Sequence, residues 1–382
     1  MKTIKVAFVD LPSEIDPKNN YIVDLLKQRY NLEFSDDPDY VFYGAFNYKY
    51  QDYADKVRIF IGGEPIVPNF NDCDYAMSHM PIQFIDRYFE AGPLLASPRE
   101  EGLKPSLQDR SHITDDLFER KFCNFVYFNS MDHDGWKVRQ DFCKKLMAEY
   151  KHVDCPGKSL NNMPEGSIAP RWVAGADGKD TVTDDVSWVN GKVAFLSKYK
   201  FTIAFENGMI PGYTTEKLID PFLANSIPIY WGNPEVTKYY NPKAFINCND
   251  YDNDFDRVIE RIKELDNDKE QYMAMLREPP LQPDFPFDMP EKFLDWVCHI
   301  IEKGKEPLCK NPAGFIAVSC PRQFETIFNE YCSRGEELKI YQNSNLWRIT
   351  MKIKKFGDSK WGYLPKKAYH FYLRCKKSIR RR

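Results

Sequence analysis

The reactive and ligand-binding side chains of this sequence gather in one short stretch, between an apolar segment and the start of a helix. They are Glu206, Asn207, Tyr213, Glu216 and Lys217. In open α/β sheets a ligand binds at such a strand-to-helix crossing, where backbone N–H groups and the helix dipole favour a phosphate group. The stretch therefore predicts a phosphate-binding site. The alternative is that these side chains only cap and solvate one βαβ unit.

Two strands and a helix must hold these side chains in place. Residues 200–205 are rich in aromatic and β-branched residues, which favours a buried strand. The Asn-Gly and Pro-Gly pairs that follow predict a loop. Thr214 and Thr215 are natural N-caps for the next helix. Residues 227–231 are again apolar, so the predicted order is strand, loop, helix, strand.

The same stretch resembles the signature of the α-1,3-fucosyltransferases of glycosyltransferase family 10. That signature reads F-x-x-x-F-E-N, a short loop, Y-x-T-E-K and then I-P-(I/V)-Y-(W/x)-G. Here it occupies residues 201–207, 213–217 and 227–232, with no departure at the polar positions. The resemblance is to the bacterial type and extends from about Glu64 to about Asp250. It implies the GT-B fold, an α/β architecture of two Rossmann-like domains facing across a cleft.

The resemblance also implies a role for each residue of the stretch. Asn207, Tyr213 and Glu216 would orient the phosphate, ribose and fucose of a GDP-fucose donor. Lys217 would stabilise negative charge on the departing diphosphate. Glu206 would stabilise the developing positive charge of the sugar or brace the loop.

Glu64 follows the apolar residues 57–61 and a Gly-Gly pair. Taken alone, it fits a solvent-facing carboxylate beside a turn. The family carries a glutamate in a Gly-Glu segment that continues to proline and phenylalanine. Residues 63–70 resemble that segment and depart from it at Pro65, where asparagine is commoner. The resemblance implies that Glu64 is the general base for the acceptor hydroxyl.

Arg139 lies near the start of a predicted helix over residues 137–150. An arginine at this place in the family contacts the donor diphosphate, and a guanidinium group can pair bidentately with phosphate oxygens. The alternative is an ordinary exposed charge on a helix.

Asp132, His133 and Asp134 spell D-x-D, a metal-binding signature of another glycosyltransferase architecture. Such triplets arise often in a chain with 56 acidic residues. The ten cysteines include no C-x-x-C pair, which argues against zinc or a redox pair. We therefore predict no metal ligands and no required cofactor.

Strands are predicted over residues 5–11, 40–45 and 57–61, with a helix over 21–30. Strands that alternate with helices indicate a parallel, doubly wound sheet. The polar residues 97–111 contain two prolines and are typical of a linker.

A chain of 382 residues suits two domains and additional segments. We predict an acceptor-binding domain over residues 1–115, a GDP-fucose-binding domain over 116–305, an extension over 306–338 and a basic tail over 339–382. A late helix, over residues 291–303, is expected to pack back across the hinge.

The tail carries 14 Lys and Arg residues against one Asp, a net charge of +13 within a chain of net charge −3. An anionic partner is therefore expected. Interleaved aromatic residues fit nucleic acid or an anionic membrane surface, and we favour the membrane because lipid-linked acceptors would lie there. The chain has no signal peptide, no spanning apolar run and no N-x-(S/T) site. We expect a cytoplasmic protein on the inner face of a membrane.

Together these features predict an inverting α-1,3-fucosyltransferase, with O-4 as an alternative position. It would move L-fucose from GDP-β-L-fucose to N-acetylglucosamine in a lactosamine-type, Lewis-related glycan. Two other functions stay open. One is a non-catalytic module that binds a nucleotide sugar or nucleic acid, and the other is a glycosyltransferase with a different donor.

Overall fold

A computed structural model of the chain describes residues 1–12, 15–92, 94, 97–107, 109–128, 134–169, 172–174, 180–182 and 185–309. They fall within one unit of the chain, Met1–Ala313. The tail and all but the first residues of the predicted extension lie outside the described residues. Among the described helices, none combines the length and the apolar composition needed to cross a bilayer.

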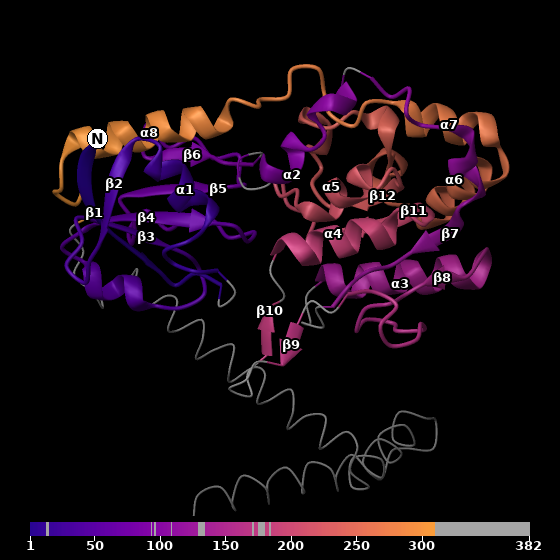
Figure 1. Cartoon of the computed structure of the whole chain (residues 1–382), viewed down its shortest axis with the longest axis horizontal. Coiled ribbons are helices and arrows are strands. Elements are labelled where there is room, and N and C mark those ends of the chain that lie inside the picture. Colours follow the sequence, from indigo (N-terminus) through magenta and orange to yellow (C-terminus); the bar gives the residue numbers. More distant parts are fainter. Residues whose placement is uncertain are drawn as a thin grey trace, which may run out of the picture. The chain divides into compact units, whose positions relative to one another are not determined.

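The amino-terminal part of the chain forms a six-stranded parallel sheet in the order β2-β1-β3-β4-β5-β6 (Figure 1). Its strands are β1 (Lys2–Val9), β2 (Tyr30–Phe34), β3 (Tyr40–Tyr43), β4 (Val57–Gly62), β5 (Tyr75–Ser78) and β6 (Tyr88–Glu90). Successive side chains of β1 point to opposite faces of the sheet. Val6 and Phe8 lie in one hydrophobic core, and Ala7 and Val9 lie in another. The sheet is doubly wound, because the chain moves from β1 outward to β2 and then back past β1 to β3.

One face of this sheet is covered by helices from both ends of the described chain. Helix α1 (Tyr21–Lys27) and helix α8 (Met289–Lys303) pack into the same core as β1, β3 and β4. This confirms that the late helix returns to the amino-terminal sheet. The predicted helix over 21–30 ends earlier, at Lys27, because Tyr30 already begins the edge strand β2.

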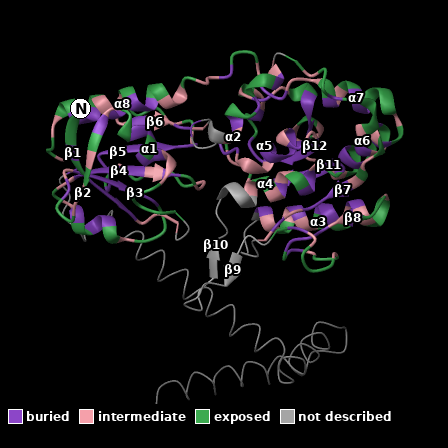
Figure 2. Cartoon of the chain, viewed as in Figure 1, coloured by how far each residue is buried: buried purple, intermediate pink, exposed green. Residues whose placement is uncertain are grey.

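A second parallel sheet has the order β13-β12-β11-β7-β8 (Figure 1). Its strands are β7 (Lys121–Asn124), β8 (Val153–Asp154), β11 (Tyr199–Phe205), β12 (Ile227–Trp231) and β13 (Ile246–Asn247). Every residue of β11 is buried, as the apolar run predicted (Figure 2). A short antiparallel pair, β9 (Trp172–Ala174) and β10 (Asp180–Val182), lies outside both sheets.

Helices cover both faces of the second sheet. On one face, α3 (Asp134–Glu149), α6 (Phe255–Asn267) and α7 (Lys269–Arg277) share a core with Phe201 and Phe205 of β11. On the other, α5 (Glu216–Leu223) packs against Ala204 and Tyr230, and α4 (Asp185–Leu196) contacts α5. The loop over residues 206–215 thus connects the carboxyl end of β11 to the start of α5.

The segment predicted as a linker is folded against the second sheet. It contains α2 (Ser97–Glu101) and a 3₁₀ turn, Lys104–Leu107, and Leu103 is buried in the core beneath α5. Its polar residues have buried partners, since Arg99 contacts Asp220 and Glu100 accepts a hydrogen bond from the Tyr240 hydroxyl. The polar composition of this segment had indicated an exposed linker. The partners that bury its polar residues lie more than 100 residues further along the chain, so the local sequence does not reveal them.

Candidate active site

Glu206 joins the end of β11 to the start of α5. Its side chain is fully buried, and its two carboxylate oxygens accept hydrogen bonds of 2.7 Å each from the Thr215 backbone N–H and the Thr215 hydroxyl. The Lys217 ammonium lies 3.6 Å from the same carboxylate. Burial raises the pKa of Glu206, and the charge of Lys217 opposes that rise. Glu206 is thus held inside the protein and connects the end of β11 to the start of α5.

Glu216 and Lys217 form the first turn of α5, which Thr215 caps as predicted. The Lys217 ammonium lies 3.3 Å from a Glu216 carboxylate oxygen. Burial alone would lower the pKa of Lys217, but the charges of Glu216 and Glu206 raise it. Burial would raise the pKa of Glu216, but Lys217, Lys192 and Arg99 hold it well below its usual range. Both groups are therefore charged at neutral pH.

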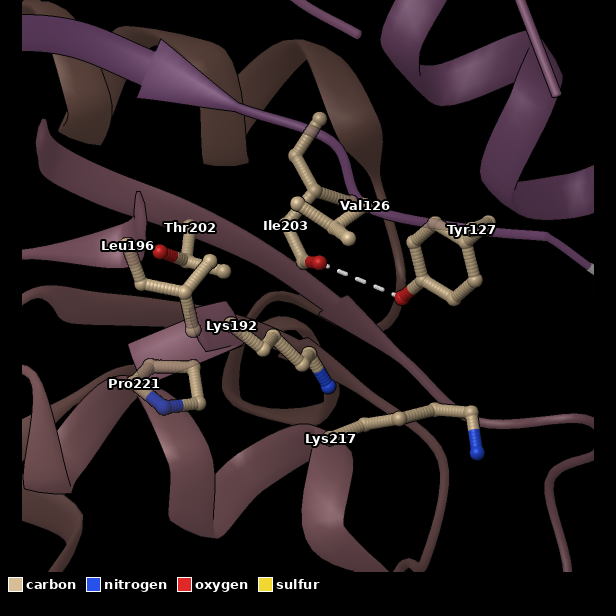
Figure 3. A pocket seen from close by; sticks show the side chains of 8 residues that line it. All are labelled: Val126, Tyr127, Lys192, Leu196, Thr202, Ile203, Lys217 and Pro221. Atoms are coloured by element: carbon tan, nitrogen blue, oxygen red, sulfur yellow. Dashed lines mark hydrogen bonds between the residues drawn. The ribbon is translucent and has the colours of Figure 1, made fainter. Parts of the chain in front are cut away.

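Lys217 also lines a small pocket together with Lys192 of α4 and Tyr127 (Figure 3). The Tyr127 hydroxyl donates to backbone carbonyls at the end of β11, those of Ile203 at 3.1 Å and Phe205 at 2.9 Å. Both ammonium groups also have carboxylate partners, Asp220 for Lys192 and Glu206 and Glu216 for Lys217.

Arg139 is buried, which rules out the exposed helix charge considered above. Its guanidinium donates to the Asn207 side-chain oxygen at 3.2 Å and stacks 4.3 Å above the Tyr127 ring. A β-carbon on Gly135, in the first turn of α3, would lie 2.3 Å from the Asn207 carbonyl oxygen. Only glycine permits this close approach, which brings Arg139 to the end of β11.

Tyr213 makes the contact with the amino-terminal sheet. Its ring is buried and meets His79, just after β5, edge-to-face with 5.3 Å between ring centroids. Gly212 has φ +80°, and a β-carbon there would lie 1.9 Å from the His79 carbonyl oxygen. The loop that carries Tyr213 therefore fits directly against His79.

Glu64 lies on the same side of the amino-terminal sheet, just after β4, and is partly buried. The pKa of Tyr213 is raised chiefly by burial, and the nearby charges of Glu206 and Glu64 add to the rise. Burial lowers the pKa of His79, and the Gly63 backbone opposes that fall. Among the predicted site residues, side-chain contacts join Lys217 to Glu206 and Glu216 and Arg139 to Asn207, while Tyr213 contacts His79.

Three residues of this region had no assigned role in the sequence: His79, Lys192 and Arg99. Burial lowers the pKa of His79 to about 4, so its ring is neutral at physiological pH. In the sequence, His79 follows an apolar strand. Polar residues at the ends of parallel strands lie at one edge of the sheet, so this position could have indicated a site residue. Lys192 and Arg99 gave no such signal, since their partner Asp220 is remote in sequence.

The described residues include no group of three His, Cys, Asp or Glu side chains that could hold a metal ion. The D-x-D triplet is not tested by this, because Asp132 and His133 lie outside the described residues, as does the side chain of Asp134.

Two parallel α/β domains with the candidate site at the carboxyl ends of their strands define a glycosyltransferase of the GT-B class. Residues 6–95 match the α-(1,3)-fucosyltransferase FucT N-terminal domain, and residues 121–278 match the glycosyltransferase family 10 (fucosyltransferase) C-terminal region. The chain belongs to the family 10 fucosyltransferases.

The chain is 32% identical to the α-(1,3)-fucosyltransferase FucT of Helicobacter pylori over 69% of its own length and 57% of that protein's. It is 27% identical to a GDP-fucose protein O-fucosyltransferase 3 of Bos taurus over 56% of its own length and 40% of that protein's. The matched part of the chain therefore covers about half of the length of these two relatives. A crystal structure of an α1,3-fucosyltransferase with GDP has a TM-score of 0.63 and 27% identity, covering 81% of this chain and 93% of that one.

Replacing Gly212 by Ala should separate the Tyr213 loop from His79. The positive φ alone disfavours alanine by about 1–3 kcal/mol, and the clash with the His79 carbonyl adds to that. Urea unfolding followed by tryptophan fluorescence should show a lower free energy of unfolding. Gly208→Ala in the same loop is the control, because its β-carbon would meet only the flexible Ile210 side chain, at 3.3 Å. An equal loss of unfolding free energy in the two variants would contradict the close approach of Gly212 to the His79 carbonyl.

Proposed function

We propose that this protein is an inverting α-1,3-fucosyltransferase that moves L-fucose from GDP-β-L-fucose to N-acetylglucosamine of a lactosamine-type glycan. The observation that carries the proposal is the environment of Tyr213. The charges of Lys217 and Glu206 from the second sheet and of Glu64 from the first all act on the pKa of Tyr213, whose ring contacts His79. A base candidate and a group of cations are thus combined at one place, as displacement of a diphosphate requires.

The donor half of the proposal rests on charge. The region contains the cations Arg139, Lys217, Lys192 and Arg99. The carboxylates of Glu216 and Asp220 are ionic partners to some of them, and Lys217 also lies 3.6 Å from the Glu206 carboxylate. The remaining positive charge would bind the diphosphate and stabilise it as it leaves. The GDP in the similar crystal structure supports a guanosine diphosphate donor.

The acceptor half rests on Glu64. In the proposed reaction its carboxylate takes the proton of the acceptor hydroxyl, whose oxygen bonds to the anomeric carbon of fucose while the bond to GDP breaks. The loop continues into Ile66 and Val67, which are 41% and 61% exposed. Adjacent exposed apolar side chains beside a base suit the apolar face of a sugar ring. The name of the Helicobacter pylori relative supports α-1,3 linkage.

Glu64→Gln should lower kcat by roughly 10²–10⁴-fold, because the amide cannot accept the proton. The affinity for GDP should stay unchanged, since Glu64 lies on the acceptor side. GDP release should be measured with GDP-fucose and lactosamine, lactose or a type-1 acceptor, and GDP affinity by calorimetry.

The control for this experiment is Glu119→Gln, which changes an exposed carboxylate outside the region. A near-normal rate for Glu64→Gln would show that another group is the base. A wild-type protein that binds GDP but turns over none of these glycans would contradict the proposed acceptor. Turnover with serine- or threonine-containing proteins would instead favour the activity named for the bovine relative.

We propose that transfer needs no divalent cation, because Lys217 and Arg139 can supply the positive charge that Mg²⁺ provides elsewhere. Activity should be the same in excess EDTA as in Mg²⁺ or Mn²⁺. An EDTA-sensitive rate restored by either metal would contradict this and would direct attention to Asp132 and Asp134.

We also propose that the basic tail binds an anionic membrane surface on the cytoplasmic side. Its net charge of +13 supports this, since each Lys or Arg near such a surface contributes about 1 kcal/mol. The full chain should cosediment with phosphatidylserine-containing vesicles, but not with purely zwitterionic ones, and high salt should release it. Binding to RNA with no binding to anionic vesicles would favour the nucleic-acid alternative.

A further inference from the structure

Charged side chains from three helices meet at one buried carboxylate beneath the donor region. Asp220, on α5, is 1% exposed. The Lys192 ammonium of α4 lies 2.8 Å from one of its oxygens, and the Arg99 guanidinium of α2 lies 3.2 Å from the other. Lys192 is itself buried, and it lines the same pocket as Lys217 (Figure 3).

Lys192 and Arg99 together carry two positive charges, whereas Asp220 carries one negative charge. A second carboxylate is needed to balance them. Glu216 precedes Asp220 by four residues on α5, so the two side chains lie on the same face of the helix. Lys192 and Arg99 both act on Glu216 and, together with Lys217, lower its pKa. Lys192, Arg99, Asp220 and Glu216 therefore form a set of two cations and two carboxylates, and Glu216 has the most exposed side chain of the four.

Glu216 is the member of this set that a ligand can reach, because its side chain is 37% exposed. An ionised carboxylate only accepts hydrogen bonds, and it can accept several at once. That property fits a ligand with neighbouring hydroxyl groups, such as a ribose or a hexose. A protonated Glu216 would lose half of this capacity.

Stability alone does not account for the buried set. Burying an ion pair removes two charges from water, and well-packed apolar side chains of similar size are often equally stabilising or more so. A requirement to hold Glu216 in a fixed position does account for it, because Asp220 ties α5 to α4 and α2 one helical turn after Glu216.

We propose that Asp220, Lys192 and Arg99 are positioning residues that hold the first turn of α5, and with it Glu216, oriented toward the hydroxyl groups of the nucleotide sugar, an inference that rests on the proposed function. None of the three needs to touch the sugar. The segment 97–107 thereby becomes a structural part of the donor site, through Arg99.

The test is a double-mutant cycle in the full-length chain. Lys192→Met keeps the length of the side chain and removes its charge, and it should raise the KM for GDP-fucose roughly five- to tenfold with a smaller effect on kcat. In a Glu216→Gln background the same change should alter KM less than twofold, because the group through which Lys192 acts is gone. Lys198→Met, an exposed lysine just after α4, is the matched control and should leave KM unchanged.

Arg99→Gln keeps the inference testable if Lys192→Met fails to fold, because the Arg99 side chain is 29% exposed and tolerates substitution better. It should give the same rise in KM and the same dependence on Glu216. Equal effects with and without Glu216, or an unchanged KM in a folded variant, would overturn the inference. Failure of the proposed function would show earlier and separately, in a wild-type protein that neither binds GDP nor releases it from GDP-fucose.

Discussion

The burial of the Glu206 carboxylate is the constraint on which the rest of the site depends. A carboxylate removed from water needs several close partners, and Glu206 finds them in the Thr215 N–H, the Thr215 hydroxyl and Lys217. All three belong to the start of α5, so the intervening loop is closed at both ends. Gly232 is part of the same constraint, since a β-carbon there would lie 2.5 Å from the Glu206 side chain. The closed loop then fixes where Asn207 and Tyr213 can lie.

Next to this loop, cations and carboxylates form ion pairs at two successive positions along α5. Lys217 lies between Glu206 and Glu216, while Asp220 holds Lys192 and Arg99 one helical turn further on. Charges fixed in this way need little rearrangement when a ligand's charge develops beside them, which is the electrostatic contribution that enzyme sites make to transition-state stabilisation. The folded protein therefore orients the positive charge before any ligand is bound.

The sequence predicted the parts of this arrangement that local pattern determines. The β11–α5–β12 order and the Thr215 cap depend on neighbouring residues, and the structure has them where expected. The packing of residues 97–107 and the burial of Arg139 depend on side chains far away in sequence, which no local pattern reveals. His79 illustrates the limit, because its position at a strand end was visible whereas its contact with Tyr213 was not.

The division of carboxylates between the two sheets has a chemical reason in the proposed reaction. Glu216 lies 3.3 Å from the Lys217 ammonium, and the nearby cations lower its pKa, so that its carboxylate is a weaker base. A base located among the cations of the donor region would thus lose the property that it needs. Glu64 comes instead from the other sheet, just after β4, and its charge contributes to the raised pKa of Tyr213. Inversion requires attack on the side of the sugar opposite to the diphosphate, and a base on a separate domain meets that geometry without being neutralised.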